Sequence, residues 1–245
     1  MRRVLAAAFL ALAVAGTGHA QTPPLTREQE EAVRALVRDT LLKNPELLLE
    51  VLDALEERKR EAMSTSRARQ IVERRAELER DPADPVHGNA AGDVTLVAFS
   101  DYRCPYCKRM AEPLAALLVE DRGLRMVVKE IPILGPESLQ AAKLALAAQR
   151  QGKHAPVHAA LMAWRGALDD DAIASLARAQ GLDLALLRRD ADSPAIASRL
   201  ERNLALARSL GIEGTPAFVI GDRFIPGAID PATLRQLIAE ARAKR

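Results

Sequence analysis

The stretch that decides the fold is VTLVAFSDYRCPYCKRM, residues 94–110, which contains the only two cysteines of this 245-residue chain. Val94 to Ser100 is short, apolar and rich in β-branched residues, which is typical of a buried strand. Cys104 and Cys107 follow at once, and apolar side chains then recur at helical spacing. The pattern predicts a strand that ends in a Cys-Pro-Tyr-Cys turn and opens a helix.

The sequence after this helix completes an α/β pattern. LRMVVKEIPI (residues 124–133) predicts a second strand, and the Ala- and Leu-rich residues 137–210 predict several helices. TPAFVIGDRFIPG (residues 215–227) predicts a hairpin that turns at Gly221-Asp222, and a last helix begins at Pro231. This order of elements predicts an α/β fold with a mixed sheet. The helical region is expected to break near four residues: Gly152, Gly166, Gly181 and Pro194.

An N-terminal helical segment is expected over residues 21–85. Thr26 and Gln29 form a capping-box pattern before a helix at 27–42, and Pro45 opens a second helix. From about residue 56 to 80 the charged residues dominate, so this stretch is expected to bury almost nothing on its own chain. The segment is either a solvated linker or a surface that packs against the same segment of other chains.

The first 20 residues have the pattern of a secretory signal peptide. Two arginines precede a short apolar run, and cleavage is expected after Ala20. The run is shorter than the ~20 apolar residues that span a bilayer. We therefore predict an exported protein in a compartment where disulfides form. The 35 basic and 33 acidic residues are balanced, which gives nucleic-acid binding no support.

The cysteine pair has three candidate uses: a structural crosslink, half of a zinc site or a redox couple. A disulfide that closes so short a loop stabilises little. His154 and His158 stand four residues apart, as zinc-binding histidines do, but Pro156 between them disfavours a shared helical face. We interpret them as surface or core-edge histidines, and we expect no metal ligand and no cofactor.

The redox interpretation follows from the position of Cys104 at a helix N-terminus. Unpaired N–H groups and the positive end of the helix dipole favour a thiolate there and lower the pKa of a cysteine. Cys104 is then the nucleophile and Cys107 the resolving thiol. The neighbouring Asp101 and Lys108 are expected to be solvated surface residues.

These motifs, together with GTPAFVIGDRFIPG (residues 214–227), resemble the DsbA family of exported thiol-disulfide oxidoreductases, over residues 86–245. The resemblance implies a thioredoxin-like fold with a helical insertion at about 137–210. It implies a cis bond before Pro216 and substrate contacts from Thr215, Pro216, Pro105 and Tyr106.

The N-terminal segment resembles that of the ScsC-like branch of this family. The likeness implies a homo-oligomer, such as a trimer, that assembles through residues 26–60. It also implies a disulfide isomerase or reductase in the periplasm. Its partners would be cysteine-containing exported proteins and a membrane redox protein. Ala98 stands where many members carry a buried acid, and Tyr106 stands where strong oxidants have histidine. The alternatives are a monomeric dithiol oxidase and a non-catalytic protein that binds metal through its thiols.

Overall fold

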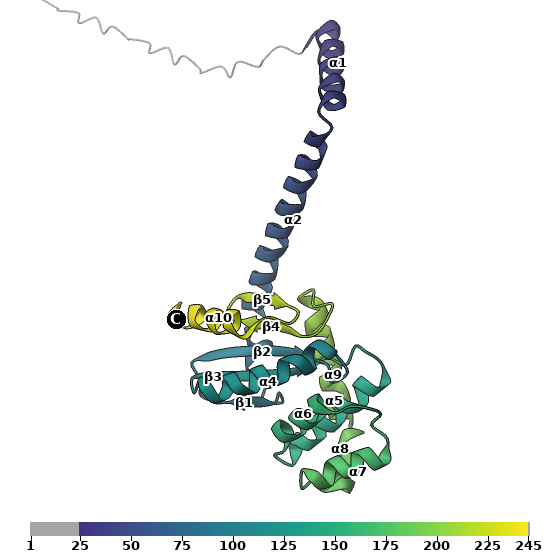
Figure 1. Ribbon diagram of the computed structural model, residues 1–245, viewed down its shortest axis with the longest axis vertical. Coiled ribbons are helices and arrows are strands. Elements are labelled where there is room, and N and C mark those ends of the chain that lie inside the picture. The colour runs from purple at the N-terminus through teal and green to yellow at the C-terminus, as the bar shows by residue number, and fades with distance from the viewer. Residues whose placement is uncertain (1–24, 245) are drawn as a thin grey trace, which may run out of the picture. The chain divides into compact units, whose positions relative to one another are not determined.

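The structure is a computed structural model that describes residues 25–244 (Figure 1). The chain divides into two units, Met1–Arg58 and Lys59–Arg245, and the division falls within helix α2 (Glu46–Glu73). The predicted signal peptide, residues 1–20, lies outside the described residues. Within residues 25–244, no helix combines the length and the apolar character needed to cross a bilayer.

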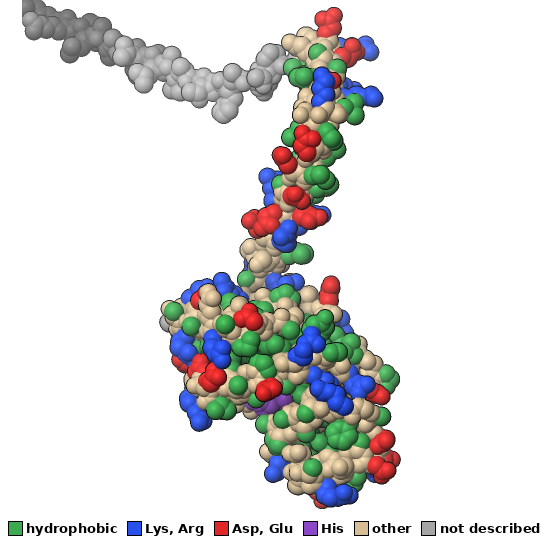
Figure 2. Space-filling model, viewed as in Figure 1, with side chains coloured by type: hydrophobic (Ala, Val, Ile, Leu, Met, Phe, Trp, Pro, Cys, Tyr) green, Lys and Arg blue, Asp and Glu red, His purple; other side chains and the backbone are tan. Residues whose placement is uncertain are grey.

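Helix α1 (Arg27–Lys43) begins where the sequence predicts. The Gln29 side chain accepts a hydrogen bond from the Thr26 N–H at 2.9 Å, and the Thr26 hydroxyl accepts one from the Gln29 N–H at 3.3 Å. This capping box is confirmed. Green apolar side chains run along α1 and the first half of α2 in Figure 2. Nine large ones are exposed: Val33, Leu36, Val37, Leu42, Leu48, Leu49, Val51, Leu52 and Leu55.

The end of α2 and the short helix α3 (Arg75–Glu79) belong to the core of the second unit. Ile71 and Leu78 are each only 1% exposed and pack with residues of the sheet. The Arg67 guanidinium lies 4.2 Å from the centre of the Phe224 ring. The expectation that residues 56–80 bury almost nothing is therefore wrong, because a few apolar side chains suffice to anchor a charged helix.

Five strands form one sheet in the order β1-β3-β2-β4-β5. β2 and β3 are parallel, and the other neighbours are antiparallel. The predicted hairpin is confirmed, since β4 and β5 flank Gly221-Asp222. Only β1 is missing from the prediction. The strands are β1 (Val86–Gly88), β2 (Val94–Ser100), β3 (Leu124–Glu130), β4 (Ala217–Ile220) and β5 (Arg223–Pro226).

Each face of the sheet has its own apolar core. Along β2, Leu96 and Ala98 point to one face, where α4 (Pro105–Glu120) and α10 (Pro231–Ala243) pack. Val97 and Phe99 point to the other face, which is covered by the end of α2, by α3 and by α9 (Pro194–Ser209). The period of two in a pleated strand accounts for this division.

A third core lies among the helices between β3 and β4, and these helices lie together beside the sheet in Figure 1. Four of the breaks between them coincide with the residues named from the sequence: Gly152, Gly166 and Gly181 have positive φ angles, and Pro194 begins a helix. The helices are α5 (Pro136–Arg150), α6 (His154–Ala163), α7 (Asp170–Ala179), α8 (Leu184–Ala191) and α9 (Pro194–Ser209). The α/β fold with a helical region is confirmed.

Candidate active site

The two cysteines lie where β2 passes into α4. Cys104 is the N-cap residue of α4, and Pro105 occupies the first turn. Both cysteines are free thiols, 4% exposed for Cys104 and 3% for Cys107. The predicted position of Cys104 at a helix N-terminus is confirmed. Its side chain makes no capping hydrogen bond to the N–H groups of the first turn.

A second segment, distant in sequence, contacts the first cysteine. The Cys104 Sγ donates a hydrogen bond to the Thr215 carbonyl oxygen at 3.1 Å. The peptide bond between Thr215 and Pro216 is cis. Tyr106 and Pro105 are exposed beside this contact, with Tyr106 at 54%. The residues expected to bind substrate therefore lie around one thiol.

Cys107 is a different kind of thiol. Burial raises its pKa from 9.0 to about 12, although hydrogen bonds with Asp101, Thr215 and Ser100 partly oppose that shift. A thiol with such a pKa carries its proton at neutral pH, and a protonated thiol is a poor nucleophile.

Asp101 is buried at 1% exposure, so the expectation of a solvated carboxylate is wrong. Its Oδ1 accepts hydrogen bonds from the Arg103 N–H and the Ser138 hydroxyl, both at 2.7 Å. Its Oδ2 accepts from the N–H groups of Ile133 at 2.8 Å and Leu134 at 3.1 Å. These four donors replace water around the carboxylate and fix the turn that carries Cys104.

Lys108 is also less solvated than the sequence suggests. Its ammonium group donates a hydrogen bond to the Trp164 carbonyl oxygen, and burial lowers its pKa. It lines an open hollow of about 620 Å³ next to Pro105. Three further cations line the same hollow: Arg103, Arg109 and Arg165. The hollow beside the thiols is therefore lined by four cationic side chains and one acidic side chain, Glu112.

The histidines form a cluster that the sequence analysis missed. His154 and His158 lie on one face of α6, because Pro156 falls in the first turn, where proline is tolerated. His87 of β1 joins them, with its Nε2 2.8 Å from the Nδ1 of His154. The interpretation as surface or core-edge histidines is wrong for His154, which is 5% exposed, and so is the expectation that Pro156 disfavours a shared helical face. In residues 25–244 the cysteines do not join the histidines in a potential metal site.

Glu130 and Tyr102 complete this buried polar group. The Tyr102 hydroxyl donates to Glu130 Oε1 at 2.6 Å and lies 2.9 Å from the Nδ1 of His158. Burial raises the pKa of Glu130 to about 8 and that of Tyr102 well above 10. Ala98 supplies no acid in β2, but a buried carboxyl group is present in β3 instead. Only the position of Glu130 within the predicted strand at 124–133 hinted at this.

The family models and the solved structures agree on one family. Residues 95–239 match the family described as DSBA-like thioredoxin domain, and residues 29–62 match the copper resistance protein ScsC N-terminal domain. A crystal structure of a thioredoxin-like oxidoreductase from Silicibacter pomeroyi is 41% identical, covers 69% of this chain and 98% of its own, and gives a TM-score of 0.66. A linker-deletion mutant of Proteus mirabilis ScsC is 31% identical, covers 92% of this chain and 100% of its own, and gives a TM-score of 0.69.

Curated relatives are of two kinds. The thiol:disulfide interchange protein DsbA of Bordetella parapertussis is 29% identical over 150 residues, which are 59% of this chain and 71% of that protein. The Na(+)/H(+) antiporter NhaA of Herminiimonas arsenicoxydans is 32% identical over 168 residues, which are 66% of this chain. The chain spans only 27% of the length of that antiporter.

Proposed function

The chain belongs to the family of DSBA-like thioredoxin domains, and on this premise we propose that it is an exported thiol-disulfide oxidoreductase that acts chiefly as a disulfide isomerase or reductase. The observation that supports this most is the 3.1 Å contact between the Cys104 Sγ and the Thr215 carbonyl, beside the cis bond to Pro216. This contact places a thiol at the N-terminus of a helix next to the backbone of Thr215, along which a substrate chain can bind.

The proposed reaction begins with the thiolate of Cys104. It attacks one sulfur of a substrate disulfide, a mixed disulfide forms, and the other substrate sulfur leaves as a thiolate. In reduction, Cys107 loses its proton and attacks Cys104, which yields the Cys104–Cys107 disulfide and a substrate dithiol. Thr215, Pro216, Pro105 and Tyr106 are proposed to hold the substrate chain.

The protonation of Cys107 favours isomerisation over reduction. Because its pKa lies at about 12, its attack on the mixed disulfide is slow at neutral pH. A second substrate thiolate then has time to attack the mixed disulfide instead. That step forms a new substrate disulfide and returns Cys104 as a thiolate, with no net oxidation or reduction.

We also propose that residues 26–60 bring several copies of the chain together, for example as a trimer. The exposed apolar side chains of α1 and the first half of α2 support an interface with other copies, since large apolar patches on a soluble surface mark contacts. Several Cys104 sites around one substrate could reshuffle its disulfides.

The remaining parts of the proposal concern location and boundaries. We propose export to the periplasm after cleavage near Ala20, and a membrane redox protein that resets the cysteine pair. The proposed segments are residues 1–20, 21–85 and 86–245, with the helical insertion at about 137–210.

Refolding of a substrate with scrambled disulfides tests the chemistry. Cys104→Ser should abolish activity, whereas Cys107→Ser should retain isomerisation and accumulate a mixed disulfide that gel electrophoresis without reductant detects. Activity that survives Cys104→Ser would refute the proposed nucleophile.

Light scattering tests the assembly. The full chain should exceed the mass of a monomer, and a deletion of residues 21–58 should be monomeric, exchange disulfides and isomerise poorly. This deletion keeps the buried Ile71 and Leu78. Leu49→Asp should also dissociate the oligomer, whereas the neighbouring Glu50→Gln should not. A monomeric full chain would favour the dithiol oxidase instead.

A further inference from the structure

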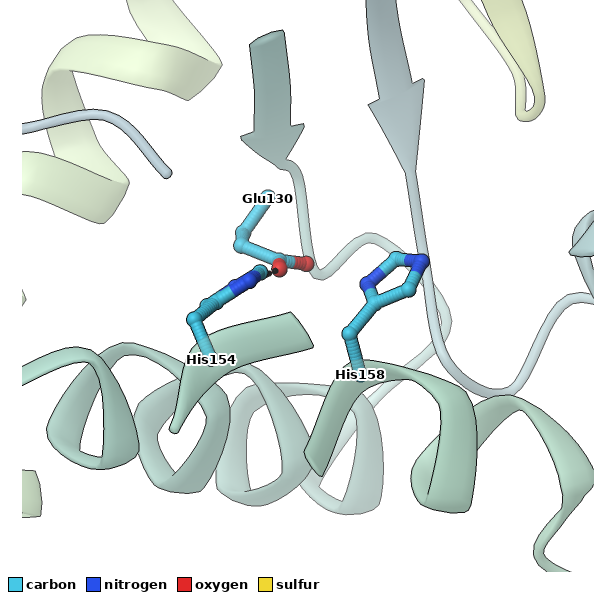
Figure 3. A group of neighbouring side chains, drawn as sticks. All are labelled: Glu130, His154 and His158. Atoms are coloured by element: carbon cyan, nitrogen blue, oxygen red, sulfur yellow. Dashed lines mark hydrogen bonds and ion pairs between the residues drawn. The ribbon is translucent and has the colours of Figure 1, made fainter. Parts of the chain in front are cut away.

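Three side chains beside the redox site have the arrangement of metal ligands. Glu130 ends β3, His154 begins α6, and His158 lies one turn later. One ligand atom from each lies within 4.8 Å of the others. In Figure 3 the carboxylate of Glu130 reaches down between the two imidazole rings. We call these three residues the Glu-His-His cluster.

The distances fit a tetrahedral ion. The Nε2 of His154 lies 3.3 Å from Glu130 Oε1. Bonds of about 2.0–2.1 Å around a tetrahedral Zn²⁺ place neighbouring ligand atoms about 3.3 Å apart. The Tyr102 hydroxyl, 2.6 Å from Glu130 Oε1, is too close to that oxygen to be a neighbouring tetrahedral ligand and instead donates a hydrogen bond to it. The three residues therefore leave the fourth position of the ion open.

The cluster is buried and contains a polar atom without a partner, which a bound ion would satisfy. The side chains of Glu130 and His154 are 0% and 6% exposed. Among the described residues, Glu130 Oε2 has no hydrogen-bond partner although it is buried. Such an orphaned carboxylate oxygen is costly.

A neighbouring side chain orients one ligand. The Nδ1 of His154 lies 2.8 Å from the Nε2 of His87, so a proton on Nδ1 donates to His87 and leaves Nε2 free to bind an ion. Hydrogen bonds of this kind to the second ring nitrogen are usual in metal sites. Histidine side chains also reach the surface in Figure 2, which offers an ion a way in.

Two features oppose a cation here. Arg199 is close enough to lower the pKa of His154, and the N-terminus of α6 carries a partial positive charge. Arg199 is itself paired with Asp84 at 3.9 Å and donates to Gln149 at 2.7 Å. Arg199 also interacts electrostatically with Glu130, so a bound cation would share that carboxylate with the guanidinium.

We propose that Glu130, His154 and His158 bind a divalent transition cation of the Zn²⁺ or Cu²⁺ class. Imidazole and carboxylate donors suit both ions. Tyr102 stands two residues before Cys104 and donates a hydrogen bond to Glu130, so an ion on Glu130 would help to hold the turn that carries Cys104. Neither thiol is among the proposed ligands.

The test uses the full chain with Cys104→Ser and Cys107→Ser, so that no thiolate competes for metal. Zn²⁺ and Cu²⁺ are titrated separately by calorimetry, and bound metal is counted by elemental analysis after dialysis. One ion per chain is expected, and the preferred ion identifies the metal. His154→Gln and Glu130→Gln should each weaken binding at least about tenfold. Glu201→Gln, an exposed acid on α9, should leave binding unchanged.

A measurement on the unaltered cluster covers the case in which a ligand variant does not fold. Zn²⁺ should shift the imidazole nitrogen resonances of both His154 and His158 in the NMR spectrum of the thiol-free chain. Metal content at background level, unshifted imidazole signals, or affinity that both ligand variants retain would overturn the proposal.

Discussion

The carboxylate of Asp101 offers a sharp test of how the active-site turn is held. Asp101→Asn keeps the shape of the side chain but replaces one oxygen by an NH₂ group. If the NH₂ group replaces Oδ2, the N–H groups of Ile133 and Leu134 face another donor; if it replaces Oδ1, only the Arg103 N–H does, because the Ser138 hydroxyl can rotate and accept. Hydrogen bonds to charged groups contribute about 1.5–3 kcal/mol each, so the loss should be about 1.5–6 kcal/mol.

Urea unfolding of the reduced protein measures this loss as a fall in the free energy of unfolding. Ser138→Ala is the matched control, because it removes one of the four donors and should cost about 1.5–3 kcal/mol. The Cys104 N–H donates to the Asp101 carbonyl at 3.1 Å, so disulfide exchange should slow as well. If Asp101→Asn costs less than about 1 kcal/mol, or less than Ser138→Ala, the carboxylate does not hold the turn.

Three further outcomes are expected. Ile71→Ala should cost about 2–5 kcal/mol in urea unfolding, whereas Val72→Ala, at an exposed neighbour, should stay within about 0.5 kcal/mol; equal effects would exclude a packed helix end. In the reduced protein the pKa of Cys107 is raised, so its neutral thiol stabilises the fold by about 4 kcal/mol below pH 9, and this is lost as the pH rises from 9.0 toward 12. Thiolate absorbance that rises near pH 9 in the folded Cys104→Ser variant would contradict the shift. Gly88→Ala should cost about 1–3 kcal/mol, because Gly88 has φ +74° and the added Cβ would lie 2.7 Å from the Leu124 carbonyl oxygen; unchanged stability would argue against this close approach.

The elements that local chemistry dictates were predictable from the sequence. The start of α1 follows from the Thr26 capping box, and the β4–β5 hairpin follows from Gly221-Asp222 between two apolar runs. Cys104 at the N-cap follows from Pro105 in the first turn. Each of these depends on residues a few positions apart. β1 escaped prediction because three residues carry no periodic pattern, and the strand exists only through its pairing with β3.

Burial at the site was not predictable in the same way. Asp101 and His154 are of residue types that are usually at least partly exposed, and both are buried in the structure. The four donors around Asp101 come from three different segments. No short-range pattern reveals that such donors will converge.

The sequence by itself determined the order of the elements, the dithiol motif at the start of a helix and the apolar face of α1 and α2. Only the tertiary structure decided which distant groups meet: Cys104 with Thr215, separated by 111 residues, and Tyr102 with Glu130, separated by 28. It also decided the protonation of Cys107 and Glu130. Hydrogen bonds within a helix or turn depend on near neighbours, but desolvation depends on every segment that packs around a group.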